Sequence, residues 1–166
     1  MKLFDFNSYI GKDVPSGEVY KETDNGSYEG VNLDQYIEDK YVILIGIPGA
    51  FTPLCTNKHL PGFVEKEKDI MSKGIDEIIC MSVNDPHVMM AFADYINSEG
   101  SKITMLADPL GEVSEQLKLL TDMGVYGPRC KRFAAVINNG KIVKMFVDEK
   151  GLDQSSAENC LNFISN

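Results

Sequence analysis

Tyr41-Val-Ile-Leu-Ile-Gly-Ile47, followed by Pro48-Gly-Ala-Phe-Thr-Pro-Leu-Cys55, reads as a buried strand that turns directly into a helix. The near-continuous apolar run is typical of a strand covered on both faces. Thr52 before Pro53 marks the helix start, because a hydroxyl can cap the first turn and proline is favoured at the first helical position. Cys55 then lies where free amides and the helix dipole favour a thiolate. We interpret Cys55 as a nucleophile, although a small buried side chain is the commoner fate of a cytosolic cysteine.

Strand and helix patterns alternate on both sides of this turn. The expected strands are 18–23, 27–30, 77–83, 102–107, 133–137 and 142–147, and the expected helical segments are 32–39, 53–73, 86–98, 111–120 and 156–164. We expect a break at Pro61-Gly62, because Pro61 has no amide to donate within a helix. Asn138-Asn139-Gly140 predicts the turn of a terminal β-hairpin. The pattern indicates an α/β protein with a central mixed sheet flanked by helices, whose chemistry lies at the carboxyl ends of strands.

Composition narrows the class of protein. The chain has 166 residues, 43% of them hydrophobic and 25% charged, which fits one globular domain spanning residues 1–166. Its net charge of −9 disfavours nucleic acid as a partner. No apolar run approaches the roughly 20 residues that cross a membrane, and the N-terminus does not resemble a secretory signal. We therefore expect a cytoplasmic protein whose four cysteines, at 55, 80, 130 and 160, are reduced thiols.

The segment around Cys55 resembles the active site of the peroxiredoxins. Pro48-x-x-x-Thr52-x-x-Cys55 is the signature of that family. The longer string Pro48 to Cys55, with His59-Leu-Pro-Gly-Phe63 after it, is similar to the atypical, type II or fifth, peroxiredoxin group. Further blocks at 82–86, 107–109 and 131–133 match the same group in order, so the resemblance covers almost the whole chain. It implies a thioredoxin-like fold and a thiol peroxidase with neither cofactor nor metal.

The resemblance also implies a role for each site residue. Cys55 is the expected peroxidatic cysteine, Thr52 the hydroxyl that hydrogen-bonds the peroxide or thiolate, and Pro48 a shield against water. Backbone amides, such as that of Leu54, are expected to stabilise the charge on the departing oxygen. Arg132 matches the arginine that the family brings from a distant strand, and Arg129 a supporting one. These are the only two arginines beside fourteen lysines. An arginine fork donates to two acceptors at once, which a lysine cannot do in the same way.

The other cysteines bear on how oxidised Cys55 is reduced. Residues 149–154, where some members of the group carry a resolving cysteine, contain none. Cys80 matches a cysteine proposed to resolve in plant-type members. It lies within an apolar strand, where packing is a strong explanation and a disulfide is poorly placed without local unfolding. Cys130 is interpreted as a possible modification site, and Cys160 as part of the last helix. We therefore expect a one-cysteine mechanism in which Cys55 reduces hydrogen peroxide and organic hydroperoxides. Glutathione with glutaredoxin, or thioredoxin, is the expected external reductant of the oxidised Cys55.

Two alternatives stay open at this point. Cys55 with His59 could form the dyad of a cysteine hydrolase or transferase, although His59 is usually structural in the family string. Cys55 and His59 could also be two ligands of a metal ion, but the two further ligands that such a site needs are missing. The same fold could also serve as a redox sensor or interaction module. Members of the group commonly form homodimers, so the resemblance implies that partner as well.

Overall fold

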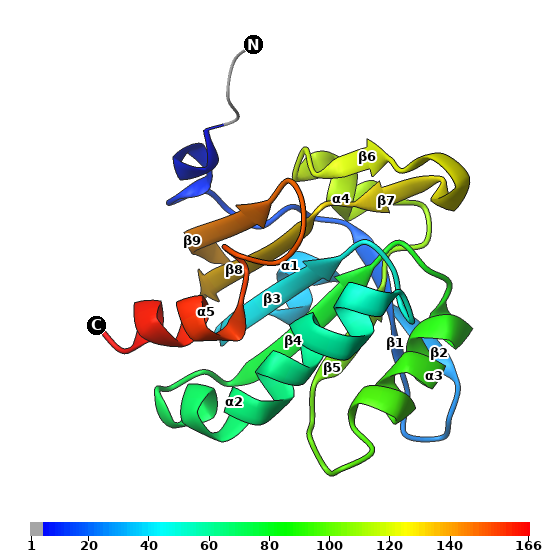
Figure 1. The fold of residues 1–166 in the computed structure, drawn as a ribbon, viewed down its shortest axis with the longest axis horizontal. Coiled ribbons are helices and arrows are strands. Elements are labelled where there is room, and N and C mark those ends of the chain that lie inside the picture. Colours follow the sequence, from blue (N-terminus) through cyan, green and yellow to red (C-terminus); the bar gives the residue numbers. More distant parts are fainter. Residues whose placement is uncertain (1–4) are drawn as a thin grey trace.

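One seven-stranded mixed sheet forms the centre of the computed structural model, which describes residues 5–166 (Figure 1). Its strands, in spatial order, are β2 (Tyr28–Asn32), β1 (Glu18–Glu22), β5 (Thr104–Ala107), β4 (Glu77–Ser82), β3 (Tyr41–Ile47), β8 (Arg132–Asn138) and β9 (Lys141–Asp148). β3, β4 and β5 run parallel, and every other neighbouring pair is antiparallel. The α/β architecture expected from the alternating pattern is therefore confirmed.

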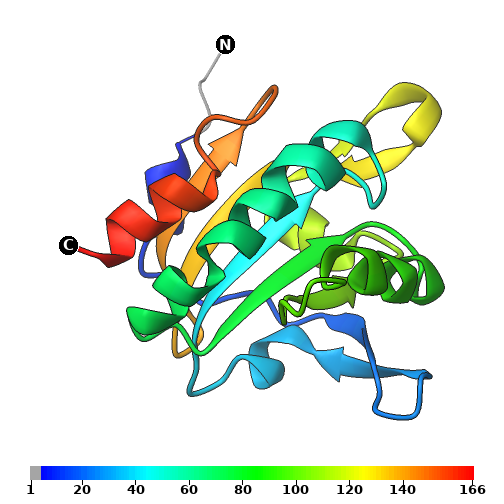
Figure 2. The same cartoon turned by 60° about the horizontal axis from the view of Figure 1, so that its bottom comes forward.

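Helices cover both faces of the sheet. α1 (Leu33–Tyr36) and α4 (Glu112–Gln116) pack on one face, and α2 (Leu60–Ser72), α3 (Pro86–Ile96) and α5 (Ala157–Ile164) pack on the other. Figure 2 shows α2 and α5 side by side across the second face. The side chains of β3 alternate between the two cores: Val42 and Leu44 join the first, while Ile43, Ile45 and Ile47 join the second. This two-sided burial explains why the strand reads as an unbroken apolar run.

Local chemistry sets several of the element ends. Asp85 caps α3 by accepting from the amide of Val88, and Ser156 caps α5 by accepting from the amide of Asn159. The hairpin between β8 and β9 turns at Asn139 and Gly140, both with positive φ (48° and 77°), as Asn-Gly predicts. The expected helix over 111–120 is wrong at its end. It stops at Gln116, because Lys118 adopts the left-handed conformation (φ 59°) and Leu120 begins β6.

The expected break at Pro61-Gly62 is displaced towards Cys55. Helical structure begins at Pro53, passes through the π-helical turn η2 (Cys55–His59), and continues as α2 with Pro61 in its first turn. The amide of Leu60 bonds the carbonyl of Cys55, five residues back. Pro61 has no amide and its ring clashes with the carbonyl four residues earlier, so the wider turn before it relieves both problems. The irregularity therefore surrounds Cys55 rather than interrupting α2.

Some elements carry no clear pattern in the sequence. A small second sheet pairs β6 (Leu120–Asp122) with β7 (Pro128–Cys130), and two 3-10 turns, η1 (Phe6–Tyr9) and η3 (Gly124–Tyr126), complete the structure. The β6–β7 hairpin projects from one end of the main sheet, next to the start of β8 (Figure 1). Over residues 5–166, no helix has the length and apolar character needed to span a bilayer.

Candidate active site

Cys55 lies where the carboxyl end of β3 leads into the first helical turn. Its side chain is fully buried. Because the helix begins at Pro53, the amides of Leu54 and Cys55 belong to the first turn, whose donors have no carbonyl four residues back within the helix. Cys55 therefore lies in the first turn, at the positive end of the helix dipole, as the sequence predicts.

The loop from Pro48 to Thr52 is held by hydrogen bonds and by ring packing. The amide of Ala50 donates to Oδ1 of Asn84 (3.0 Å), at the loop that follows β4. The Thr52 hydroxyl donates to the carbonyl of Gly49 (2.6 Å), so it does not act as the cap that the sequence suggests. Phe51 adopts a left-handed backbone conformation (φ 65°), which is unusual for an aromatic residue. Its ring packs edge-on against Phe92 of α3, with centroids 5.1 Å apart. These contacts fix the turn that presents Cys55.

Arg132 reaches Cys55 from the first position of β8. Its Nη2 donates to Sγ of Cys55 across 3.3 Å, and its Nη1 lies 2.9 Å from Nδ1 of His59. The side chain is only 7% exposed, so little water competes for the guanidinium. Arg132 therefore holds a fixed positive charge within hydrogen-bond distance of the Cys55 sulfur in a buried site. The structure thus brings together the two residues that the sequence singles out most strongly.

His59 belongs to the same cluster, and sequence reasoning undervalued it. Its Nε2 lies 2.9 Å from the carbonyl of Ser155, which can only accept, so Nε2 carries the proton and donates. Nδ1 is then free to accept from Arg132. Burial first, and the Arg132 charge second, lower the pKa of His59 from 6.5 to about 4, so the ring is neutral at pH 7. Its spacing of one helical turn from Cys55 was the available signal, but it suggested a dyad rather than a partner for Arg132.

The dyad alternative finds no support in this geometry. Within residues 5–166, no hydrogen bond joins His59 to Cys55, because the Arg132 guanidinium contacts both. Both ring nitrogens of His59 already have partners, at Ser155 and Arg132. A general base needs a free lone pair directed at the proton that it removes.

Arg129 supports the loops around the site rather than the sulfur. Its Nη1 donates to the carbonyl of Val83 (3.0 Å) and its Nε to the carbonyl of Tyr126 (2.8 Å). A Cβ on Gly49 would approach Nη1 of Arg129 to 3.3 Å, so glycine at 49 leaves room for this side chain. The contacts tie the β6–β7 hairpin to the loop that follows β4. They explain why Arg129 is partly buried, and its supporting role stays a prediction.

The remaining cysteines are buried thiols, and over residues 5–166 the Arg132 guanidinium donates a hydrogen bond to none of them. Cys55, Cys80, Cys130 and Cys160 are all free, and all lie in the cores on the two faces of the sheet. Burial raises the pKa of Cys80 well above its ordinary value, and raises the pKa of Cys130 and of Cys160 to about 12. At neutral pH these three are therefore protonated and weakly reactive.

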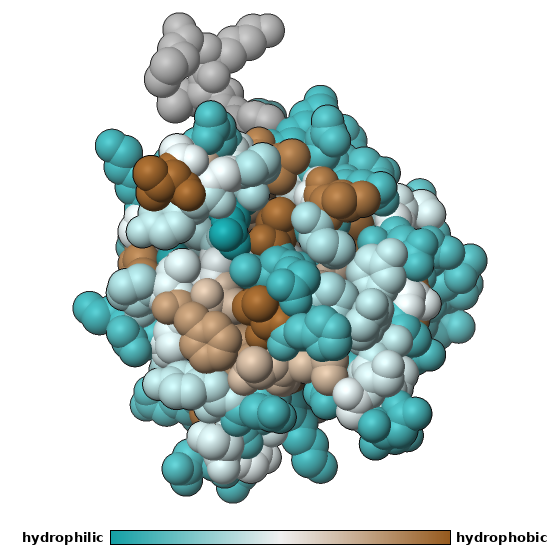
Figure 3. Space-filling view, turned by 90° about the vertical axis from the view of Figure 1, so that its right-hand side faces the viewer, coloured by the Kyte–Doolittle hydropathy of each residue, from teal (hydrophilic) through white to brown (hydrophobic). Residues whose placement is uncertain are grey.

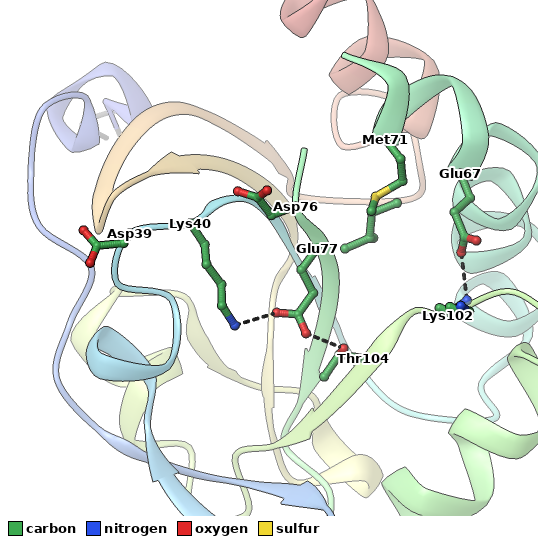
Figure 4. A pocket seen from close by; sticks show the side chains of 9 residues that line it. Asp39, Lys40, Glu67, Met71, Asp76, Glu77, Lys102 and Thr104 are labelled. Carbon is green, nitrogen blue, oxygen red and sulfur yellow. Dashed lines mark hydrogen bonds and ion pairs between the residues drawn. The ribbon is translucent and has the colours of Figure 1, made fainter. Parts of the chain in front are cut away.

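One cavity lies beside the Cys55 cluster, and another lies at the opposite end of the strands. One of about 350 Å³ opens beside Pro48 and Arg132 and is bounded by the β6–β7 hairpin and the loop after β9. Another, of about 550 Å³, lies at the amino ends of β3 and β4, the opposite end of the strands from Cys55 (Figure 4). There the carboxylate of Glu77 already accepts from Thr104 (2.8 Å) and pairs with Lys40 (3.4 Å). Only the first cavity gives a solute access to a member of the Cys55 cluster.

Comparison with known proteins places these features in a family. A family model described as Redoxin matches residues 10–161. Peroxiredoxin-2D of Arabidopsis thaliana is 41% identical over 159 residues, covering 93% of this chain and 97% of its own. Peroxiredoxin-2C of Oryza sativa subsp. japonica is 35% identical over 144 residues, covering 86% and 88%.

Solved structures of peroxiredoxins are also similar to this chain. Reduced Prx3 from Vibrio vulnificus, crystallised in complex with hydrogen peroxide, superposes with a TM-score of 0.88 at 33% identity, covering 93% of this chain and 98% of that one. The Plasmodium falciparum antioxidant protein, described as a 1-Cys peroxiredoxin, gives 0.86 at 26% identity, covering 95% and 98%. The chain therefore belongs to the Redoxin family and is a peroxiredoxin, a thiol-dependent peroxidase with a thioredoxin-like fold.

Proposed function

We propose that Cys55 is the residue that reduces hydroperoxides and that an external thiol, rather than a second cysteine of the chain, regenerates it. The observation that carries the first part is the hydrogen bond from Arg132 Nη2 to the Cys55 sulfur at 3.3 Å. A buried arginine contacting a thiol at a helix start is an arrangement for keeping a thiolate next to a fixed positive charge. Cleavage of a peroxide needs a thiolate to attack the oxygen and a positive charge to stabilise the departing oxygen.

The proposed first step transfers one oxygen atom to sulfur. The Cys55 thiolate forms a bond to the outer oxygen of ROOH, the O–O bond breaks, and the electron pair leaves on RO⁻, which then takes a proton. Cys55 becomes a sulfenic acid. Arg132 and the amides of Leu54 and Cys55 donate to the oxygens on which negative charge develops. The Thr52 hydroxyl has its own hydrogen directed at Gly49, so its lone pairs accept from the peroxide O–H.

The cavity beside Pro48 and Arg132 supports a proposal on the substrate range. Pro48 and Arg132 form part of the wall of the cavity of about 350 Å³. That volume exceeds what hydrogen peroxide needs, so we propose that small organic hydroperoxides are reduced as well. Pro48 would limit water access to the thiolate from this side.

The proposed second step uses two molecules of external thiol. The first condenses with the sulfenic acid to give a mixed disulfide and water, and the second releases the Cys55 thiol and a disulfide. Glutathione with glutaredoxin, or thioredoxin, can supply these thiols. Two features support this route over internal resolution: residues 149–154 contain no cysteine, and the raised pKa of Cys80 keeps it a thiol at neutral pH.

The exposed surface and the free thiols support proposals on the assembly and location of the protein. Figure 3 shows apolar residues gathered on the end of the molecule that carries α3 and the β6–β7 hairpin. The large exposed apolar side chains include Phe51, Tyr95, Leu110, Val125 and Tyr126. We propose that this face forms a homodimer, since exposed apolar patches of soluble proteins commonly mark interfaces. Four free thiols fit the reducing cytoplasm.

The one-cysteine proposal is tested with a variant in which Cys80, Cys130 and Cys160 are all replaced by Ser. We expect this variant to consume peroxide with glutathione and glutaredoxin, or with thioredoxin, at close to the wild-type rate. Cys55→Ser is the matched control and should show no turnover. Because a buried serine hydroxyl is costly, the same three positions are also replaced by Ala, and folding is checked by circular dichroism. Intact oxidation of Cys55 without thiol-dependent turnover, in both folded sets, would overturn the proposal.

A further inference from the structure

Asp148, the last residue of β9, lies directly opposite Arg132 in the β8–β9 ladder. It is 6% exposed. Its hydrogen-bond donors nevertheless come from the loop that follows it and not from Arg132. The amides of Asp153 (3.2 Å), Gln154 (2.8 Å) and Ser155 (3.0 Å) all donate to the carboxylate, and so does the Ser155 hydroxyl (2.7 Å). A single carboxylate therefore folds the whole loop between β9 and α5 back onto the end of its own strand.

The loop donors stabilise the ionised form of Asp148. Burial by itself raises the pKa of Asp148, but the hydrogen bonds from the loop amides and the Ser155 hydroxyl outweigh burial, so the pKa lies below its ordinary value. An amide side chain of the same shape has one acceptor oxygen and a nitrogen that donates. It cannot accept all four bonds, and it would place its own donor against a backbone donor.

The loop in turn fixes the position of one carbonyl group. Ser155 is fully buried, and it precedes Ser156, the cap of α5, so it is held on both sides. Its carbonyl lies 2.9 Å from Nε2 of His59. A carbonyl only accepts, so this contact selects the tautomer of His59 that is protonated on Nε2.

That tautomer is the one Arg132 requires. Nη1 of Arg132 is a donor, and it can bond Nδ1 of His59 only when Nδ1 carries a lone pair. In the other tautomer two N–H groups would face each other in a site where His59 is 1% and Arg132 7% exposed. The guanidinium would turn away, and with it the second arm of the fork that donates to Cys55.

We propose that Asp148 is a positioning residue of the peroxidase. Its carboxylate holds the 149–155 loop, the Ser155 carbonyl selects the His59 tautomer, and His59 orients Arg132 towards the Cys55 sulfur. This inference rests on the proposed roles of Cys55 and Arg132. It adds that the loop after β9, which in this chain carries no cysteine, contributes to catalysis through geometry.

The test begins with Asp148→Asn, matched by Ser155→Ala, which removes one hydroxyl but keeps the carbonyl and the backbone donors. The rate of Cys55 oxidation by hydrogen peroxide should fall about 10- to 100-fold in Asp148→Asn, the range found for groups that orient a metal ligand from behind. In Ser155→Ala it should fall by no more than about threefold. An unchanged rate in a folded Asp148→Asn variant would overturn the proposal.

A double-mutant cycle separates positioning from general weakening of the fold. Asn at position 59 offers an acceptor to Arg132 but cannot span to the Ser155 carbonyl. If Asp148 acts through His59, Asp148→Asn should have little further effect on the oxidation rate in the His59→Asn background. Additive losses would show that Asp148 acts by another route, and would overturn the proposal.

The tautomer itself is read from the ¹⁵N resonances of the His59 ring. Wild-type protein should show a single tautomer protonated on Nε2, and Asp148→Asn should show exchange between the two tautomers. Wild-type His59 protonated on Nδ1 would overturn the proposal, whether or not the variant folds. This readout needs no peroxide chemistry. A wild-type Cys55 that fails to react with peroxide would therefore count against the proposed function, while the tautomer still reports on the relay from Asp148.

Discussion

Nη2 of Arg132 donates a hydrogen bond to Sγ of Cys55 across 3.3 Å, although 77 residues separate them in the chain. The order and direction of the strands in the sheet explain this contact. β8 lies antiparallel to β3, so the start of β8 and the carboxyl end of β3 share one edge, with Gly46 opposite Phe133. A Cβ at Gly46 would come within 2.0 Å of the Phe133 ring, so glycine is required for the two strands to pack here. The loop that leads to Cys55 begins at Pro48, two residues beyond Gly46, and the helix that carries Cys55 begins at Pro53.

Replacing Arg132 by Met should slow Cys55 oxidation by roughly 10²–10³-fold, the effect of losing one fixed donor at a developing negative charge. Arg132→Lys keeps the charge but not the planar fork that reaches Cys55 and His59 together, so its rate should fall between the two. Stopped-flow measurement with hydrogen peroxide gives the rates. Equal rates for wild type and Arg132→Met would remove Arg132 from the mechanism.

Arg129→Met is the matched control for that measurement. Arg129 donates to the carbonyls of Val83 and Tyr126 and not to the sulfur. We expect a loss of stability of about 1–3 kcal/mol, because the partly buried carbonyl of Val83 loses a charged donor, while the exposed carbonyl of Tyr126 returns to water. The oxidation rate should change far less than in Arg132→Met, and a loss of the same size would mean that any change of charge in this region slows the reaction.

Stability should fall as the pH drops from about 6.5 to 4, because of His59. Its pKa is about 4 in the folded protein and near 6.5 when exposed, so between these values the unfolded chain binds the extra proton. The stabilising effect is complete above pH 6.5 and is lost as the pH falls to about 4. At about 1.4 kcal/mol for each pH unit, the contribution is about 3 kcal/mol. Urea unfolding at a series of pH values measures it.

His59→Asn provides the comparison for the pH series. This side chain does not titrate, so the variant should show a flatter dependence of unfolding free energy on pH between 4 and 6.5. The lowered pKa of Asp148 contributes at the acid end in both proteins, because its stabilising effect is lost only as the pH falls through the folded value. Identical slopes for wild type and His59→Asn would show that His59 does not titrate as described.

Thr56→Val should stabilise the protein, because the Thr56 hydroxyl oxygen is buried and has no hydrogen-bond partner in residues 5–166. Valine has the same shape and removes the unpaired group, so we expect a gain of about 1 kcal/mol, seen as a higher Tm. Thr52→Val makes the matched comparison, since the Thr52 hydroxyl donates to Gly49. That variant should lose about 1 kcal/mol. A lower Tm for Thr56→Val would indicate that its hydroxyl is bonded.

Thiol labelling at pH 7 should modify Cys55 before any other cysteine. The raised pKa values of Cys80, Cys130 and Cys160 leave almost no thiolate at these positions, whereas Cys55 is beside a guanidinium. Mass spectrometry after a short exposure to iodoacetamide should find one label per chain, and none in Cys55→Ser. Modification of Cys80 at a rate comparable to that of Cys55 would contradict this order.

The sequence predicts the parts of this structure that depend on local pattern. The apolar run of β3, the Asn139-Gly140 turn and the Ser156 cap each follow from a handful of neighbouring residues. The approach of Arg132 to Cys55 was expected only through resemblance to the peroxiredoxins. Nothing in the residues around position 132 states which distant side chain it will touch.

The features that the sequence did not reveal depend on contacts between distant segments. His59 was set aside as structural, because its partners, Arg132 and the Ser155 carbonyl, lie 73 and 96 residues away. The sequence predicts a break at Pro61, whereas the structure has a π-helical turn at Cys55–His59. Proline shows where an amide is missing, but it does not show which turn of the helix widens. Reduction of the sulfenic acid by an external thiol rather than by Cys80 stays a prediction.

In the proposed cycle, peroxide oxidises Cys55 and an external thiol restores it. Mass spectrometry of the protein after one equivalent of hydrogen peroxide, with and without glutathione, tests this most directly. We predict a sulfenic acid on Cys55 alone, and a glutathione adduct on Cys55 when glutathione is present. A disulfide between Cys55 and Cys80 would contradict the account.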